Sequence, residues 1–245
     1  MNYLYDDTFE GFLTCVWHHW RTGKADGIFS NNGAYQLDLL HYAQTVETDG
    51  RKAEAVAEAI MRKISRWDAE RIYRVFLTDE PEKEMKLLSY IRLGFKEGPK
   101  IRLLHGHPVV APVQKAEYRF GAEVHRLCGL VRFSELDGGT LFARIEPDND
   151  VLAHLAPHFA DRFKSEPFLI HDARRGKALF AYERRWEVAP FDEGAYLRFS
   201  GGEAQIRQLW KEYHAVMATK ERLNPKLQRQ FMPARYHKYL TEMQP

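Results

Sequence analysis

A short acidic stretch is the first part of the sequence whose residue types could do chemistry. Glu146, Asp148 and Asp150 alternate along it, and Glu123 with His125 forms an upstream pair of a base and an orienting carboxylate. Carboxylates grouped in this way act as general acids and bases or hold a divalent metal ion. No nucleophile accompanies these carboxylates, and we expect no metal site. Acid–base chemistry is what remains, and its candidate catalytic residues are Glu146, Asp148 and His125.

The same acidic stretch has a plainer structural interpretation. Apolar residues at helical spacing predict a helix over residues 151 to 164. Asp148, Asn149 or Asp150 immediately precedes it, and these residue types are preferred at helix N-caps because their side chains accept backbone N–H groups. We therefore expect one of the three to cap this helix.

Two arginines lie on the arms of a predicted β-hairpin whose turn is residues 137–139. A three-residue loop puts the apolar residues of both arms on one face, and this register sets Arg132 opposite Arg144. Like charges directly opposite each other are destabilising, so an anion should lie between them. Either Glu146 or another internal carboxylate supplies it, or a bound phosphate does, which a pair of guanidinium groups suits well.

Residues 222 to 240, RLNPKLQRQFMPARYHKYL, combine basic and aromatic side chains without a single acid. The candidate nucleic-acid-binding residues in this segment are Arg222, Lys226, Arg229, Arg235, Tyr236 and Lys238. Such a composition is expected where cations neutralise phosphates and aromatic rings meet bases. Alternatively, the aromatics dock the segment on the core while the basic groups stay solvated or pair with the acidic N-terminal region. Both interpretations stay open, and Arg174 and Arg175 at a predicted hairpin tip would extend a basic surface.

Several common chemistries are disfavoured by missing motifs. The chain has no G-x-x-x-x-G-K-[ST], G-x-G-x-x-G, G-x-S-x-G or H-E-x-x-H pattern, so a nucleotide hydrolase or an α/β-hydrolase is not expected. Its two cysteines, Cys15 and Cys128, are too few for an iron–sulfur cluster, and we expect them to be reduced thiols on apolar helix faces. No cofactor is expected.

The totals describe a folded globular chain with an uneven charge distribution. The 245 residues are 44% hydrophobic and 13% aromatic, and the net charge is only +2. Residues 203–245 nevertheless hold eight lysines and arginines against four glutamates, which makes the C-terminal end positive. Neither a spanning segment nor a signal peptide is evident, so we expect a cytoplasmic protein without a membrane partner.

The periodicity predicts an α+β fold with two regions. Residues 1–122 read as a mainly helical region, with Asp7 or Thr8 as the first N-cap. Residues 123–245 read as an α+β region with antiparallel hairpins, a crossover helix and a helical C-terminus, and the two regions could form one intimate domain. The predicted strands are 129–135, 140–146, 167–172, 177–182 and 185–189.

Six long strings in order along the chain resemble one bacterial family. They are YDDTFEGFLT, YIRLGFKEG, EVHRLCGLVRF, IEPDNDVLAHLAPHFADRF, IHDARRG and ERLNPKLQRQFMPARYHKYL. The family is described as DNA metabolism or DNA repair proteins, and its members are paired with a radical SAM DNA modification/repair protein. A similar domain is joined to uracil-DNA-glycosylase-like proteins. Where relatives often read E-P-D-H-N, this chain has Asn149 in place of the histidine, which weakens a catalytic assignment for that corner.

The resemblance and the residues together give three functional hypotheses. The first is a DNA-binding accessory of the radical SAM enzyme, which this chain cannot itself be because it lacks the three-cysteine motif. The second is a protein-interaction module that docks the radical SAM partner without DNA contact. The third is an enzyme that acts on damaged DNA through Glu146, Asp148 and a histidine.

Overall fold

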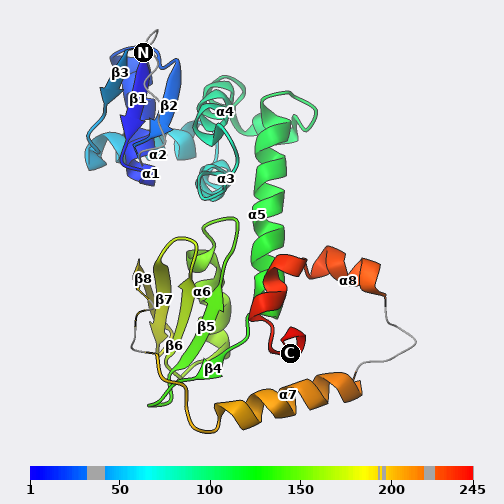
Figure 1. The fold of residues 1–245 in the computed structure, drawn as a ribbon. Coiled ribbons are helices and arrows are strands. Elements are labelled where there is room, and N and C mark those ends of the chain that lie inside the picture. Colours follow the sequence, from blue (N-terminus) through cyan, green and yellow to red (C-terminus); the bar gives the residue numbers. More distant parts are fainter. Residues whose placement is uncertain (32–41, 193, 195–196, 218–223, 245) are drawn as a thin grey trace. The chain divides into compact units, whose positions relative to one another are not determined.

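The computed structural model describes residues 1–31, 42–192, 194, 197–217 and 224–244. The chain divides into two compact units, Met1–Phe120 and Gly121–Pro245 (Figure 1). Along the described part of the chain, no helix is long and apolar enough to cross a membrane.

A three-stranded parallel sheet, which the sequence pattern did not predict, lies within the first unit. β1 (Asn2–Tyr5) is central, with β2 (Gly27–Ser30) on one side and β3 (Ala43–Thr45) on the other. Tyr3 and Tyr5 of β1 are fully buried. The strands are too short to show a clear period of two, so the prediction of a mainly helical region missed them.

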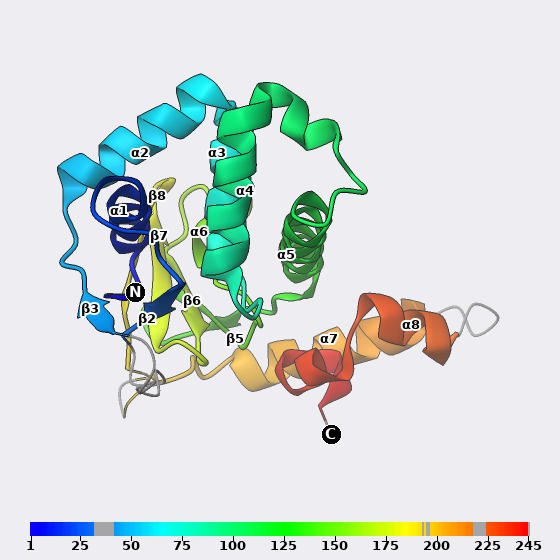
Figure 2. The same ribbon diagram turned by 90° about the horizontal axis from the view of Figure 1, so that it is seen from above.

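Helices make up most of the rest of this unit, as predicted. They are α1 (Phe9–Arg21), α2 (Gly50–Lys63), α3 (Arg66–Phe76), α4 (Lys83–Glu97), the 3-10 helix η1 (Gly98–Leu103) and the start of α5 (Val110–Leu130). Figure 2 shows α1 end-on, between the strands of the sheet and α2. Thr8 caps α1 as predicted, since its side-chain oxygen accepts a hydrogen bond of 3.0 Å from the backbone N–H of Gly11.

A buried charged group ties three helices of the first unit together. Arg71 on α3 donates to Glu117 Oε2 on α5 at 2.5 Å and to the Tyr90 hydroxyl on α4 at 2.8 Å. The Tyr90 hydroxyl in turn donates to Asp68 at 2.7 Å. Because every partner is internal, the charges are matched inside the bundle.

The second unit is built on a five-stranded mixed sheet with the strand order β4-β5-β6-β7-β8. The strands are β4 (Ser134–Glu135), β5 (Leu141–Ile145), β6 (Phe168–Asp172), β7 (Lys177–Tyr182) and β8 (Arg185–Pro190). β5 and β6 are parallel and joined by α6 (Leu152–Arg162), while the other neighbours are antiparallel. This is the predicted α+β arrangement of hairpins with one crossover helix.

Apolar side chains of α6 form the core against one face of this sheet. Leu152, Leu155 and Phe159 are almost fully buried, as are Ile145 and Ile170 on the strands. The α6 stripe recurs at helical spacing, which explains why the sequence pattern located this helix correctly.

The β4–β5 hairpin has the predicted register but a much shorter ladder. Ser134 pairs with Phe142, and the hydrogen-bonded ladder contains no residue before Ser134. The helix α5 continues to Leu130, so the predicted strand 129–135 is wrong over its first five residues. Arg132 therefore lies outside the ladder, and the predicted direct opposition of Arg132 and Arg144 is wrong.

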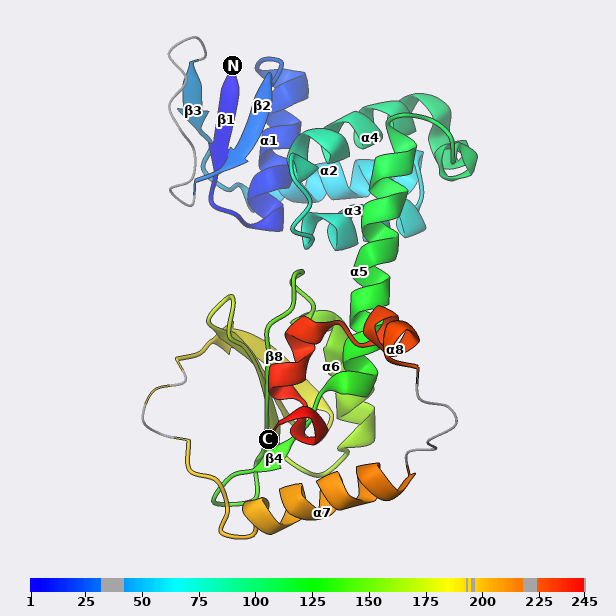
Figure 3. The same cartoon turned by 45° about the vertical axis from the view of Figure 1, so that its right-hand side comes forward.

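Four helical segments of the described residues complete the C-terminal unit. They are α7 (Glu203–Met217), α8 (Pro225–Phe231), and the 3-10 helices η3 (Ala234–Tyr239) and η4 (Thr241–Met243). Figure 3 shows α7 running across the end of this unit, below η3 and η4. The Asn224 side chain caps α8 by accepting from the backbone N–H of Leu227 at 3.0 Å.

Candidate functional site

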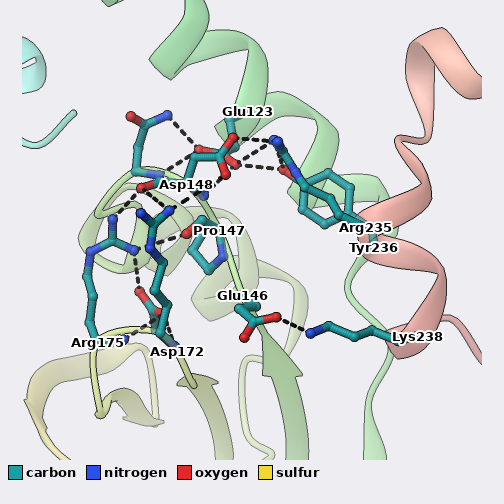
Figure 4. Close-up of polar contacts among 11 residues, drawn as sticks. Glu123, Glu146, Pro147, Asp148, Asp172, Arg175, Arg235, Tyr236 and Lys238 are labelled. Atoms are coloured by element: carbon teal, nitrogen blue, oxygen red, sulfur yellow. Dashed lines mark hydrogen bonds and ion pairs between the residues drawn. The ribbon is translucent and has the colours of Figure 1, made fainter. Parts of the chain in front are cut away.

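The buried carboxylate of Glu123, on α5, lies at the centre of a group of polar residues that includes part of the acidic stretch (Figure 4). Its Oε1 accepts from the Tyr236 hydroxyl at 2.6 Å, the backbone N–H of Asp148 at 3.0 Å and Arg235 at 3.3 Å. Its Oε2 accepts from both the backbone and the side-chain N–H groups of Asn149. We call these five residues the Glu123 network, and it joins α5, the loop before α6 and η3.

The hydrogen bonds of the network outweigh the cost of burying a charge. Burial by itself would raise the pKa of Glu123, but the donors from Tyr236, Asp148 and Asn149 hold that pKa below its ordinary value. Burial and the same hydrogen bond raise the pKa of Tyr236 to about 12. At neutral pH the pair is therefore an ionised carboxylate bound by a neutral phenol.

Asp148 turns its carboxylate toward the C-terminal segment. It forms an ion pair of 2.5 Å with Arg235 and a longer one of 3.7 Å with Arg174. Its backbone carbonyl also accepts from Arg175. The predicted helix cap is wrong, because the N-cap residue of α6 is Val151 and no side chain caps it.

The hairpin-tip residues pair with acids beside them. Arg175 contacts the fully buried Asp172 at 3.0 Å, and Lys177 pairs with Asp150. Asp172 also accepts from the backbone N–H of Arg174 at 3.0 Å. These contacts fix the β6–β7 turn, so Arg174 and Arg175 are held by the fold.

Glu146 belongs to the same chain of contacts. Lys238 on η3 donates to its carboxylate, and the Tyr239 hydroxyl lies 3.4 Å from it. The hydrogen bond from Lys238 is the main cause that lowers the pKa of Glu146. Arg144 stands over the Tyr239 ring, 5.9 Å from its centroid.

Arg132 has an internal carboxylate partner. It holds Glu242 through two hydrogen bonds, Nη2 to Oε1 at 2.6 Å and Nε to Oε2 at 3.1 Å. Trp210 Nε1 donates to the same carboxylate at 2.9 Å. An internal carboxylate, Glu242, therefore neutralises Arg132.

The acidic corner as folded is a set of matched ion pairs. Glu146 and Asp148 each face a cation of η3, and among the described residues His125 is exposed on α5 and bonds to neither carboxylate. Across the described part of the chain, no group of three or more His, Cys, Asp and Glu side chains is placed to hold a metal ion. These ion pairs join η3 to the acidic stretch.

Other side chains of α7 and α8 remain exposed. On α8, Lys226 and Arg229 make no ion pair with any described residue, and Phe231 is 67% exposed. On α7, the Trp210 and Tyr213 rings lie 5.8 Å apart and both are partly exposed. We call these five residues the α7–α8 surface, a name that covers two helices which Figures 1 and 3 show apart from each other. Of the predicted nucleic-acid-binding residues, Arg222 lies outside the described residues.

Sequence reasoning found only part of this surface. Lys226 and Arg229 were predicted from the acid-free segment, whereas Trp210 and Tyr213 were assigned only to a helix. The available signal was the helical periodicity of the apolar residues in α7, which marks an apolar face but does not show what covers it.

Comparison with known proteins identifies a family. The family model described as Domain of unknown function (DUF4130) matches residues 81–242, and the chain therefore belongs to this family. No curated protein matches the chain.

Proposed function

We propose that the C-terminal unit binds DNA, as an accessory of a repair or modification system in which a radical SAM enzyme performs the chemistry. The observation that carries this proposal is the contrast among the basic residues. Arg132, Arg235 and Lys238 are neutralised by internal carboxylates, while Lys226 and Arg229 make no ion pair with a described residue.

Cations without internal partners suit phosphate binding for a physical reason. A lysine or arginine that neutralises a phosphate releases condensed counterions, which drives binding. A cation already held by a carboxylate must first lose that partner, so it contributes less to phosphate binding. On α8 the two available cations stand with the exposed Phe231, and an aromatic ring of this kind can stack on an unpaired base.

The role of accessory follows from the resemblance to DNA repair proteins and from the cysteine content. The chain holds two cysteines, and radical SAM chemistry uses an iron–sulfur cluster bound by three. A partner must therefore supply that cluster if the pair acts on DNA.

Fluorescence anisotropy of the purified chain tests the proposal. Labelled single-stranded, duplex and uracil-containing DNA would be titrated at two salt concentrations. We expect binding that weakens as salt rises, because displaced counterions make affinity salt-dependent. Absence of binding to all three DNAs at low salt would contradict the proposal.

A second function is favoured by the apolar side of α7. Ile206, Leu209, Val216 and Met217 are each more than half exposed, and exposed apolar stripes mark protein-binding sites. In this alternative the unit docks the radical SAM protein and contacts no DNA. Co-purification of the two proteins after nuclease treatment, without binding to free DNA, would favour it over the first.

A further inference from the structure

A cavity of about 390 Å³ lies where α7 meets α6 and the residues that follow α5. The residues that matter for its chemistry are Phe133, Phe163, Trp210, Arg132, Arg162 and Arg207. Small-molecule sites have volumes of roughly 300–1,000 Å³ and combine apolar walls with a few fixed polar groups. The cavity fits that description in both size and lining.

Aromatic rings line one side of the cavity. The Phe133 and Phe163 rings meet edge-on with centroids 4.8 Å apart, and Phe133 meets the buried Phe159 in the same way at 5.3 Å. These ring contacts hold the side chains in place, so this wall is formed before a ligand binds. It offers a flat molecule an apolar contact.

Trp210 is held in place at the mouth. Its Nε1 donates to Glu242, and the guanidinium of Arg132 lies 5.4 Å from its ring centroid. Because the same Glu242 binds Arg132 through two hydrogen bonds, the indole is oriented by a rigid pair. The half-exposed indole can therefore stack without first losing much side-chain freedom.

The charges around the cavity leave one cation available. Arg132 is matched by Glu242, and Arg207 is matched by Glu203 at 2.8 Å. Arg162 is exposed and makes no ion pair with a described residue, although its guanidinium lies 5.6 Å from the Phe163 ring centroid. Among the described residues that line the cavity, Arg162 is therefore the one unmatched guanidinium, and it lies beside aromatic rings.

From this arrangement we infer that the cavity binds one nucleotide, with the base against the aromatic wall and Trp210 and the phosphate at Arg162. Guanidinium groups bind phosphate through paired hydrogen bonds, and aromatic side chains stack on bases of any sequence. The inference deepens the proposed DNA-binding function and rests on it where the nucleotide is an unpaired one within DNA. A free nucleotide has the same chemistry and is the other source.

Cys128 gives a readout inside the cavity itself. It lines the cavity and is half-buried, whereas Cys15 is buried in the first unit, and the chain has no other cysteine. The rate at which iodoacetamide alkylates Cys128, followed by peptide mass spectrometry, should fall when the cavity is occupied. Alkylation of Cys15 in the same samples reports global unfolding.

The experiment uses the full chain with thymidine 5′-monophosphate, thymidine and deoxyribose 5-phosphate as probes. We expect the monophosphate to protect Cys128 most strongly, because it alone uses both halves of the site. Arg162→Ala should weaken the binding of the monophosphate by about tenfold, which is the contribution of one charge-assisted contact. The binding of thymidine should not change. Lys164→Ala, which removes an exposed cation outside the cavity lining, is the matched control and should change neither.

Two DNA experiments distinguish a nucleotide within DNA from a free nucleotide. They also test the cavity separately from the proposed DNA-binding function. A duplex with one unpaired thymine is compared with a fully paired duplex, by anisotropy and by protection of Cys128. Protection by the unpaired thymine that Arg162→Ala abolishes supports the site within DNA. Protection by the free monophosphate alone, with no binding of either duplex by anisotropy, supports the cavity and contradicts the DNA-binding function.

Two further outcomes would overturn the inference. DNA binding without protection of Cys128 by any probe would reject the cavity while leaving the proposed function intact. Equal losses in Arg162→Ala and Lys164→Ala would show that the cavity does not hold the phosphate. Because Arg162 is exposed, its variant should fold, and Trp210→Ala then tests the stacking half separately.

Discussion

The Glu123 network and the α7–α8 surface contain the same kinds of side chain, but the network pairs them internally and the surface leaves them exposed. In the network, Arg235 and Tyr236 both donate to the buried carboxylate of Glu123, and Arg235 also pairs with Asp148. On the surface, Lys226, Arg229 and Phe231 face solvent without an ion pair to any described residue. The difference teaches that basic and aromatic composition alone does not identify a binding surface, since pairing decides which cations remain available.

The largest expected effect comes from breaking the network at its centre. Glu123→Gln keeps the size of the side chain but removes the charge and turns an NH₂ group toward hydrogen-bond donors. We expect a loss of about 3 kcal/mol in the free energy of unfolding, since a buried group then loses its matched partner.

Chemical denaturation measures this loss, and Glu187→Gln on the exposed strand β8 is the matched control. The control should stay within about 0.5 kcal/mol of the wild type, as surface substitutions usually do. A loss in Glu123→Gln no larger than in the control would show that the network does not stabilise the unit.

Acid should break the same network in the wild-type chain. The pKa of Glu123 is lower in the folded protein than in the unfolded chain, so its contribution is complete above the ordinary glutamate pKa of about 4.3. The contribution disappears as pH falls through the lower folded value. Unfolding free energies measured from pH 7 down to pH 3 should therefore fall more steeply for the wild type than for Glu123→Gln, and parallel curves would contradict this.

A smaller effect is expected where α7 meets the C-terminal segment. Trp210→Phe keeps an aromatic ring but removes the hydrogen bond to Glu242. We expect a loss of about 1.5–2 kcal/mol, at the lower end of the range for hydrogen bonds to charged groups, because the indole is partly exposed. Limited proteolysis should cut α7 faster in this variant than in Tyr213→Phe, whose ring is similarly exposed, and equal rates would argue against the anchoring role.

The smallest effect on stability is expected on α8. Lys226→Ala removes an exposed cation, so the free energy of unfolding should change by less than about 0.5 kcal/mol. If Lys226 contacts a phosphate, the slope of log affinity against log salt should fall by about 0.9. An unchanged slope would remove Lys226 from the binding surface.

The sequence predicted the elements of the second unit better than their contacts. β6, β7 and β8 were placed within a residue or so because alternation and Gly176 mark the strands and the turn. The start of β4 was missed because α5 continues to Leu130, and helix length depends on tertiary packing that periodicity does not contain.

The candidate site was predictable in composition but not in pairing. Arg235 lies 112 residues from Glu123 in the sequence, and Lys238 lies 92 from Glu146. Pairs at such separations are set by how the C-terminal segment docks, and no local pattern encodes that. The basic segment was therefore found, whereas the division between its paired and available cations required the structure.

The most direct test of this division compares two double variants by the salt dependence of DNA binding. Lys226→Ala with Arg229→Ala removes two available cations, and Arg235→Ala with Lys238→Ala removes two paired ones. We predict that the first pair lowers the salt slope by about 1.8 and leaves stability unchanged, while the second lowers stability and leaves the slope of the folded protein intact. The reverse result, with the slope lost only in the second pair, would contradict the account.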